Sequence, residues 1–271
     1  MKVFISVDIE GSATSAVWDE TMVLRGTAPA TEHQRQMTQE VLAACRGAIK
    51  AGATEILIKD AHSRGLNIIP DDLPECAELI RGWAGHPFMM VEQVDSSYDA
   101  ALFVGYHTTA GRDGSLLSHS LSLDVQEMYI NDIEASEFLI FSWACALCGV
   151  PAVYLSADKQ MCEDGARLWP SLVTTAVKEG WGASVRCMAP KKALRLIEED
   201  VERALRQDLD VAKIVLPDFF KLKVIYKEPS RAFKVSQYPG VTMVNEKTVA
   251  YESNDYLEVL RTIMFICHYA Y

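Results

Sequence analysis

Apolar and polar residues alternate over the first ten positions of the chain. The odd-numbered residues from Val3 to Ile9 are apolar and would share one face of an extended segment, and the even-numbered residues would share the other. A period of two residues is typical of a β-strand, so a strand is predicted over 2–9. Asp8 and Glu10 then stand at its end on the same face, as two like charges beside the core.

A helical period follows this strand. Thr31 and Gln34 have the spacing of a capping box, which predicts the start of a helix. Apolar residues then recur every three or four positions as far as Ile49, and a second apolar strand is predicted over 55–59. A strand, a helix and a strand in this order form a parallel unit, so the pattern indicates the beginning of a parallel sheet.

Similar runs continue along the chain. They predict strands over 100–105, 128–130 and 152–156, a helix over 134–148, and a helix that begins at Pro190. Residues 138–157 carry no charge over a length that could span a membrane. Gly149 and Pro151 interrupt this stretch, so it is interpreted as a buried helix, a turn and a buried strand, with no membrane partner.

The pattern changes beyond residue 216. Short strands are predicted over 221–227, 232–238, 240–244 and 248–251, before an apolar helix over 256–268. The predicted fold is therefore α/β, with a mostly parallel central sheet flanked by helices and a smaller β-rich C-terminal subdomain. Residues 1–215, completed by a C-terminal helix over 253–271, would form the catalytic domain, and 216–252 would form a β-rich appendage at an oligomer contact or at the pocket.

Composition and charge narrow the classes of function. The 271 residues are 49% hydrophobic and 23% charged, as is usual for a globular protein. A net charge of −11 gives no basic footprint for a nucleic acid. The seven cysteines have no framework spacing and no secretory signal is recognised, so reduced thiols and a cytoplasmic location are expected.

Three successive predicted strands end in residues that can bind a metal ion. The first ends with Asp8 and Glu10, the second with Asp60 and His62, and the third with His107. The carboxyl ends of parallel strands meet at one edge of a sheet, and neighbouring strands lie ~4.8 Å apart. These side chains can therefore converge, and a cation between the two carboxylates would let them tolerate each other.

The residue types indicate which cation suits the site. Carboxylate oxygens and imidazole nitrogens without thiolates favour Zn²⁺, Mn²⁺ or Fe²⁺ over Ca²⁺ or Mg²⁺. One carboxylate can bridge two ions ~3.5–4 Å apart, as in two-metal hydrolases, and Asp8 is the natural bridge because it lies further inside. The sequence has no signature of a nucleotide site, a nucleophile elbow or an HExxH zinc helix.

Seven short segments carry a further signal. They are SVDIEG (6–11), KDAHS (59–63), LFVGYH (102–107), LLSHS (116–120), YINDIEASE (129–137), VTTAVK (173–178) and RCMAPKKA (186–193). In their order and spacing they resemble the M55 family of metallopeptidases, the D-aminopeptidases. The resemblance implies a binuclear zinc aminopeptidase that releases N-terminal D-amino acids, of the D-alanyl type, from short peptides with a free N-terminus. It also implies a homo-oligomer built from rings, with a decamer as the family arrangement.

The resemblance also implies a role for each matching residue. Asp8 would bridge two Zn²⁺ ions, Glu10 and His62 would complete the first site, and His107 and Glu137 would complete the second. Glu137 is not indicated by the strand-end argument and enters from the resemblance alone.

His119, in LLSHS, matches the residue that the family treats as catalytic. We expect a metal-activated water as the nucleophile, with His119 stabilising the oxyanion or protonating the leaving amine. Asp60 is expected to orient an imidazole. The run GSATSAVW (11–18) departs from the family pattern, which leaves the preference for D-residues open. Two alternatives remain: a metal-dependent amidase or peptidase of other stereospecificity, and a non-catalytic metal-binding ring protein.

Overall fold

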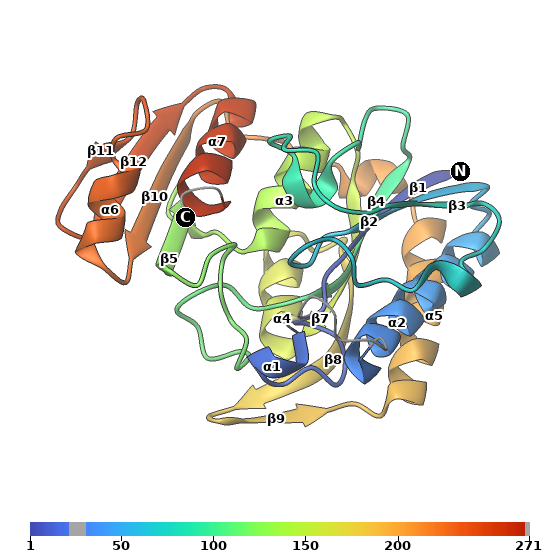
Figure 1. Ribbon diagram of the computed structural model, residues 1–271. Helices are drawn as coiled ribbons and strands as arrows, with labels where there is room; N and C mark the ends of the chain where they lie inside the picture. The colour runs from blue at the N-terminus through green and yellow to red at the C-terminus, as the bar shows by residue number, and fades with distance from the viewer. Residues whose placement is uncertain (22–30, 269–271) are drawn as a thin grey trace.

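A seven-stranded sheet forms the centre of the computed structural model, which describes residues 1–21 and 31–268 (Figure 1). The strand order is β3-β2-β1-β4-β7-β8-β9, and every neighbouring pair is parallel except β8 and β9. Its strands are β1 (Lys2–Val7), β2 (Glu55–Asp60), β3 (Ala77–Ile80), β4 (Ala100–Tyr106), β7 (Ala152–Asp158), β8 (Val173–Trp181) and β9 (Ser184–Cys187). The predicted mostly parallel sheet is confirmed.

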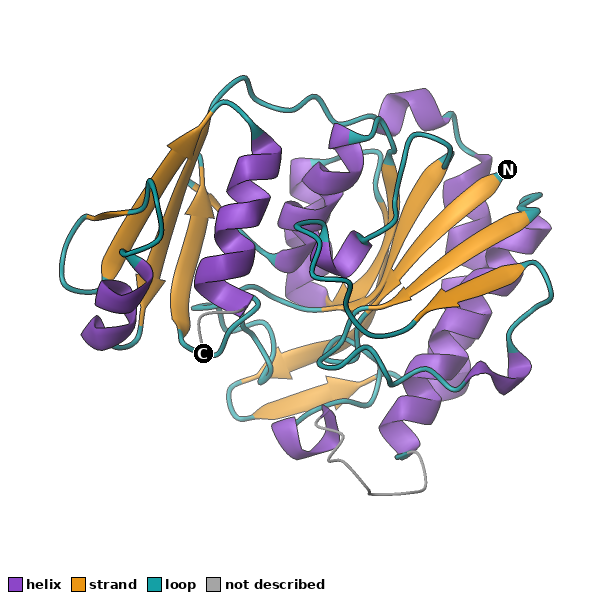
Figure 2. Ribbon diagram, turned by 45° about the horizontal axis from the view of Figure 1, so that its top comes forward, coloured by secondary structure: helices purple, strands orange, loops and turns teal. Residues whose placement is uncertain are grey.

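Helices cover both faces of this sheet (Figure 2). One face packs on α2 (Glu32–Lys50) and α5 (Pro190–Arg206), and the other on α3 (Glu137–Leu147) and α4 (Lys159–Leu168). The alternation along β1 decides which side chain meets which layer, since Ile5 joins the α2–α5 core and Phe4 joins the core under α3. The predicted capping box at Thr31 and Gln34 is present at the start of α2.

A second, antiparallel sheet lies beside the first, at the left of Figure 1, in the order β11-β12-β10-β5-β6. Its strands are β5 (Val125–Ile130), β6 (Ile133–Glu134), β10 (Phe220–Tyr226), β11 (Thr242–Met243) and β12 (Thr248–Ser253). Residues 128–130 therefore belong to this sheet and not to the parallel one. The helix α7 (Tyr256–Ile263), which continues as a π-helix over Met264–His268, packs between the two sheets. Residues 269–271 of the predicted C-terminal helix lie outside the described residues.

The two sheets share one hydrophobic core. The rings of Phe220 and Tyr256, from the C-terminal part, meet Trp143 of α3 at centroid distances of 5.9 and 5.6 Å. The predicted division at residues 216 and 252 stays a prediction. The second sheet also takes β5 and β6 from the part of the chain before residue 216.

Some predicted elements are wrong or absent. The strand predicted over 232–238 is instead the helix α6 (Pro229–Val235), which begins with a proline in its first turn and buries Ala232 and Val235 on one side. Proline fixes a helical φ, which the alternating pattern alone does not reveal. The sequence patterns also missed β3, β8, β9 and α4, as well as α1 (Trp18–Thr21) and the 3₁₀ turns Pro70–Asp72, Met89–Val91 and Leu209–Ala212.

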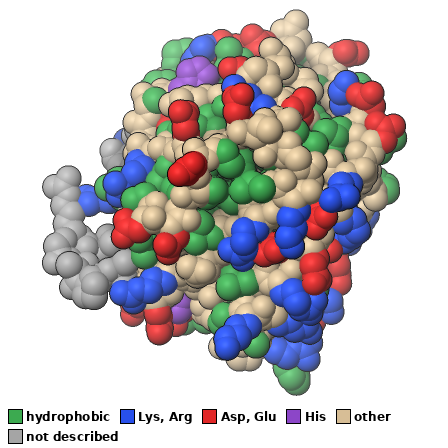
Figure 3. Space-filling view, turned by 90° about the vertical axis from the view of Figure 1, so that its right-hand side faces the viewer, with side chains coloured by type: hydrophobic (Ala, Val, Ile, Leu, Met, Phe, Trp, Pro, Cys, Tyr) green, Lys and Arg blue, Asp and Glu red, His purple; other side chains and the backbone are tan. Residues whose placement is uncertain are grey.

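The uncharged stretch over 138–157 forms α3 and β7, as the sequence predicts. Across the residues that the structure describes, no helix combines the length and the apolar character that crossing a bilayer requires. On the side where α2 and α5 lie, acidic and basic side chains are interspersed (Figure 3), and Glu198 pairs with both Arg46 and Lys50.

Two glycines, Gly11 and Gly105, allow the chain after β1 to lie directly against the end of β4. The N–H of Asp8 bonds to the carbonyl of Val104, and the N–H of Gly11 to the carbonyl of Gly105, both at 2.8 Å. A Cβ on Gly11 would lie 1.7 Å from the carbonyl oxygen of Tyr106, which no side chain could accommodate. The glycines of SVDIEG and LFVGYH are thus the residues that bring the acidic end of β1 next to the histidine after β4.

Candidate metal centre

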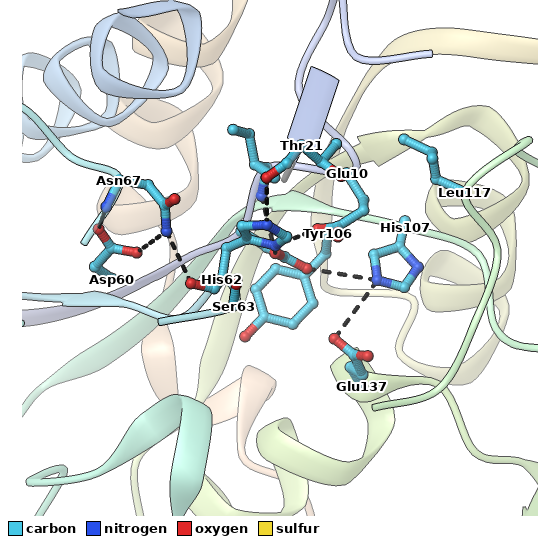
Figure 4. A network of polar contacts seen from close by, with 12 residues as sticks. Glu10, Thr21, Asp60, His62, Ser63, Asn67, Tyr106, His107, Leu117 and Glu137 are labelled. Atoms are coloured by element: carbon cyan, nitrogen blue, oxygen red, sulfur yellow. Dashed lines mark hydrogen bonds and ion pairs between the residues drawn. The ribbon is translucent and has the colours of Figure 1, made fainter. Parts of the chain in front are cut away.

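Two groups of potential metal ligands lie next to each other at the carboxyl edge of the parallel sheet (Figure 4). Within each group, one ligand atom per residue lies within 4.8 Å of the others. The groups found among the described residues are Asp8, Glu10 and His62, and His107, His119 and Glu137. The structure therefore brings together all six residues that the sequence and the resemblance indicate.

Asp8 lies between the two groups. Its Oδ1 is 3.3 Å from Nδ1 of His62, and its Oδ2 is 3.5 Å from Nε2 of His107. Glu10 completes the first group, with Oε2 2.9 Å from the same nitrogen of His62. The two oxygens of one carboxylate thus face imidazoles from two different strand ends, which is the arrangement that a bridging ligand requires.

Glu137 connects the residues of the second group. Its Oε2 lies 3.5 Å from Nε2 of His107, and its Oε1 lies 3.6 Å from Nε2 of His119. The N–H of Leu121 donates to Oε1 at 2.7 Å. The ring of His119 stacks on that of His107 with centroids 4.3 Å apart and planes inclined by 8°. His119 is therefore part of the second group and in contact with its other members.

Each of the three imidazoles is held by a backbone carbonyl through one ring nitrogen. These bonds join His62 Nε2 to Thr21 O (2.8 Å), His107 Nδ1 to Thr108 O (2.9 Å) and His119 Nδ1 to Leu117 O (2.9 Å). A bond of this kind fixes the tautomer and leaves the other nitrogen for a metal or for proton transfer.

The donor set fits a metal ion. Nε2 of His107 is buried and makes no hydrogen bond to any described residue, since the facing oxygens of Asp8 and Glu137 each lie 3.5 Å away. Buried polar atoms almost always have a partner, so this nitrogen between two carboxylates indicates a missing ligand. Oxygen and nitrogen donors without a thiolate suit zinc.

Burial and neighbouring charges shift the pKa values in this cluster. Burial and the charge of Glu10 raise the pKa of Asp8 well above its usual range. Burial acts to lower the pKa of His107, but Glu137 and Asp8 outweigh it and raise this pKa to about 10. Burial and the charge of His107 lower the pKa of His119. Without a cation, the carboxylates therefore hold a proton on His107, which a metal ion would have to displace.

Asp60 supports the segment around His62 through its backbone. Its carboxylate accepts bonds from the N–H groups of Asn67 (2.6 Å) and Ile68 (2.8 Å) and from Nδ2 of Asn67 (2.8 Å). The same Nδ2 also donates to the carbonyl of His62 at 2.8 Å. The expected direct contact between Asp60 and an imidazole is absent, because the carbonyl of Thr21 holds the ring.

Two further buried charges hold the other ligand segments, and the sequence reasoning missed both. Asp158 accepts bonds from the N–H (2.7 Å) and Oγ1 (2.5 Å) of Thr108, next to the ligand-bearing end of β4. Lys178 of β8 donates to the carbonyls of Glu10 and Ser15, the latter at 2.6 Å. The sequence signals for them are a lysine within an apolar segment, for Lys178, and an acid at the end of an apolar strand, for Asp158.

Glu137 owes its place to a helix terminus. It is the first residue of α3, and Ser136 caps this helix by accepting a bond from the N–H of Leu139 at 3.0 Å. A carboxylate is favoured there by the helix dipole, although Glu137 is only 3% exposed. An acid directly after a serine cap, at the start of an otherwise uncharged helix, is the local signal for it.

The family model for D-aminopeptidases, Peptidase_M55, matches residues 1–265 of the chain. The chain belongs to this family. A D-aminopeptidase of Bacillus subtilis (strain 168) is 31% identical over 272 residues, which cover 100% of this chain and 98% of the relative. The solved structure of the Zn-dependent D-aminopeptidase DppA from Bacillus subtilis, described as a self-compartmentalizing protease, is similar with a TM-score of 0.91 at 30% identity. The match covers 100% of this chain and 98% of that one.

These similarities confirm the family membership predicted from the seven segments, and with it the prediction of a peptidase. They also confirm the α/β fold with its second sheet, since the match to the solved structure extends over the whole chain. The individual roles of the six clustered residues stay predictions.

Proposed function

We propose that the protein is a binuclear zinc aminopeptidase that releases N-terminal D-amino acids, of the D-alanyl type, from short peptides. The observation that carries this proposal is the position of Asp8, whose two oxygens face His62 and His107 in two adjoining ligand groups. The zinc dependence of DppA and the family of the chain support it. Mn²⁺ or Fe²⁺ would suit the same donors.

Asp8, Glu10 and His62 would hold one ion, and Asp8, His107 and Glu137 would hold the other. Bound zinc supplies a water of lowered pKa and a polarised scissile carbonyl. The carboxylates of the cluster also give the cationic amine of a peptide a complementary surface. The recognition of a free N-terminus follows from this charge, because a blocked and neutral terminus would lose the attraction.

His119 is proposed as the proton carrier. Its Nδ1–H donates to the carbonyl of Leu117, so Nε2 of the neutral ring holds a free lone pair and points into the cluster. The pKa of His119 is lowered by burial and by His107, which favours this neutral form. Nε2 can then accept a proton from the attacking water and return it to the leaving amine. Stabilisation of an oxyanion would instead require a proton on Nε2, so that this atom could donate a hydrogen bond.

The proposed assembly is a ring-based homo-oligomer, a decamer as the resemblance implies, located in the cytoplasm. The description of DppA as self-compartmentalizing supports an assembly, and the seven unpaired cysteines support a reducing compartment. Large apolar side chains stand exposed at the end of β8 and on the second sheet and its helix, with Trp181 at 83%, Phe233 at 63% and Val244 at 60%. The part of the chain over 216–252 is proposed to supply such contacts.

Elemental analysis and a paired hydrolysis assay test the proposal. Zinc-reconstituted protein should contain about two zinc ions per chain and should cleave D-Ala-D-Ala faster than L-Ala-L-Ala. Equal or L-biased rates would leave a metallopeptidase without D-specificity. Metal without hydrolysis of either peptide would favour a non-catalytic metal-binding ring protein.

A further inference from the structure

The pocket above the metal ligands has an apolar side that the proposed chemistry does not use. The pocket measures about 190 Å³ and is lined by all of the clustered residues except His107. Its apolar wall, as we call it here, consists of Trp18, Trp83, Met89, Met90, Leu121 and Leu123. Apart from the clustered ligands and His119, no ionisable side chain of the described residues lines this pocket.

Backbone conformation shows that the wall is a built feature. Six described non-glycine residues have a positive φ, and three of them line this pocket: Ser63 (51°), Met89 (38°) and Leu121 (62°). Such conformations are strained and persist where surrounding structure holds them, most often at binding sites. The N–H of Leu121 is held by Glu137, so this part of the wall is tied to a proposed metal ligand.

Polar and ring contacts hold the two tryptophans of the wall. The indole N–H of Trp83 donates to the carbonyl of Ser63 at 2.8 Å, and Nζ of Lys59 lies 4.2 Å from the centroid of the indole ring. Lys59 in turn pairs with Glu92 at 2.8 Å, and both are almost completely buried. Trp18 meets the ring of His119 edge to face, with centroids 5.1 Å apart. Both tryptophans of the wall are thus anchored by neighbouring groups, and Trp18 connects the wall to the ligand cluster.

We propose that the apolar wall binds the side chain of the N-terminal residue and selects uncharged aliphatic residues up to the size of leucine or methionine. This inference rests on the proposed function and extends its substrate from D-alanyl peptides to peptides with a larger aliphatic residue at the N-terminus. The N-terminal residue carries both the amine and the scissile carbonyl, so its side chain is the one held next to the ligands and the wall.

Size and charge support this assignment. An apolar cavity of about 150 Å³ can hold a benzene molecule, so the part of this 190 Å³ pocket that lies along the wall is on the scale of one aliphatic side chain, and the rest lies over the clustered ligands. A charged side chain would lose its hydration against the wall without gaining a partner in the wall. A methyl group would leave most of the wall uncovered.

Two peptide series on the zinc-loaded protein test the assignment. In the first series, D-Xaa-Gly with D-Leu, D-Met, D-Ala, D-Glu or D-Lys, kcat/KM for D-Leu and D-Met should equal or exceed that for D-Ala. The two charged residues should fall at least about 10-fold below D-Leu. In the second series, D-Ala-D-Xaa, the same side chains should change kcat/KM much less. A flat first series, a D-Leu rate far below D-Ala, or discrimination confined to the second series would each overturn the assignment.

A charge placed in the wall provides a second test. Leu123 is 50% exposed, so Leu123→Lys should fold. This variant should raise kcat/KM for D-Glu-Gly relative to D-Leu-Gly by about two- to five-fold, as expected for a partly exposed ion pair. The control is Leu147→Lys at the end of α3, where Leu147 is 42% exposed and outside the pocket; it should leave the ratio unchanged. An equal change in both variants would overturn the assignment.

Failure of the wall and failure of the proposed function can be separated by binding. Free D-Leu, D-Ala and D-Glu are titrated into zinc-loaded protein with tryptophan fluorescence as the readout, since Trp18 and Trp83 lie in the wall. If no peptide is hydrolysed but D-Leu binds more tightly than D-Glu, the wall is supported and the proposed reaction fails. If peptides are hydrolysed and the three amino acids bind alike, the reaction stands and the wall assignment fails.

Discussion

Lys178 offers the sharpest test of how the proposed metal centre is held together. Its ammonium is almost completely buried and donates to two backbone carbonyls, those of Glu10 and Ser15. In Lys178→Met, the aliphatic part of the side chain is kept and both carbonyls lose their donor. Hydrogen bonds to a charged group contribute about 1.5–3 kcal/mol each, so two represent roughly 3–6 kcal/mol.

An opposing effect reduces this value. Burial lowers the pKa of Lys178, which shows that its charge is poorly solvated in the fold, and the substitution removes that cost. We therefore expect the free energy of unfolding to fall by about 3 kcal/mol. Because Glu10 would lose the bond that fixes its backbone, zinc affinity should also fall by about 10- to 100-fold, as it does when groups that orient metal ligands are removed.

Urea unfolding of the metal-free protein and competitive zinc titration measure the two effects. The matched control is Lys159→Met, because Lys159 is half exposed and pairs with Glu179 at the surface. It should change the free energy of unfolding by less than about 1 kcal/mol and leave zinc affinity unaltered. If Lys178→Met behaved like this control in both measurements, the argument that Lys178 holds the ligand segment would be refuted.

Three other predictions concern the cluster and its surroundings. Asp8→Asn should lower the zinc content of both sites, as read by elemental analysis; retention of one full equivalent would contradict bridging. His119→Ala should keep the zinc content and abolish peptide hydrolysis, and loss of metal would make it a ligand instead. Burial raises the pKa of Glu40 from 4.5 to about 7, so the folded protein holds this proton more tightly than the unfolded chain. The resulting stabilisation is present below about pH 4.5 and is lost as pH rises to about 7, by up to ~3 kcal/mol. Glu40→Gln should remove this loss in urea unfolding at pH 5 and 8, and an unchanged pH profile would contradict the shift.

The residues of the site that stand at strand ends could be predicted, because their positions follow from the geometry of a parallel sheet. Asp8, His62 and His107 occur where strands end, and alternation along a strand is readable in the sequence. Parallel pairing then places these ends at one edge without any knowledge of the loops. The glycines at 11 and 105, which let the two strand ends touch, have their effect only through this pairing and were recognised only as parts of family segments.

The positions of the two remaining residues, Glu137 and His119, depend on contacts between segments that are distant in the sequence. Glu137 begins a helix, and His119 lies in a loop, so neither position follows from a strand period. The strand predicted over 128–130 lies in the second sheet and not in the predicted parallel one, because a short apolar run does not indicate its partner. Here the partner is β10, about ninety residues further along the chain. Register between such distant strands is decided by the assembled core and not by local pattern.

The pairing of β5 with β10 connects the C-terminal part of the chain to the second ligand group. Between His107 and Glu137 the chain leaves the parallel sheet, forms β5 and β6 in the second sheet, and returns at the start of α3. Two contacts close the excursion: Oγ1 of Thr109 donates to the carbonyl of Ala135, and the N–H of Ala135 donates to the carbonyl of Met128. The strand β10 pairs with β5 and so holds the far end of the same excursion. The C-terminal part of the chain provides none of the proposed ligands, but through β10 it helps to hold the segment that joins His107 to Glu137. Removal of β10 should therefore lower metal binding at the second ligand group before the first, as competitive zinc titration would measure.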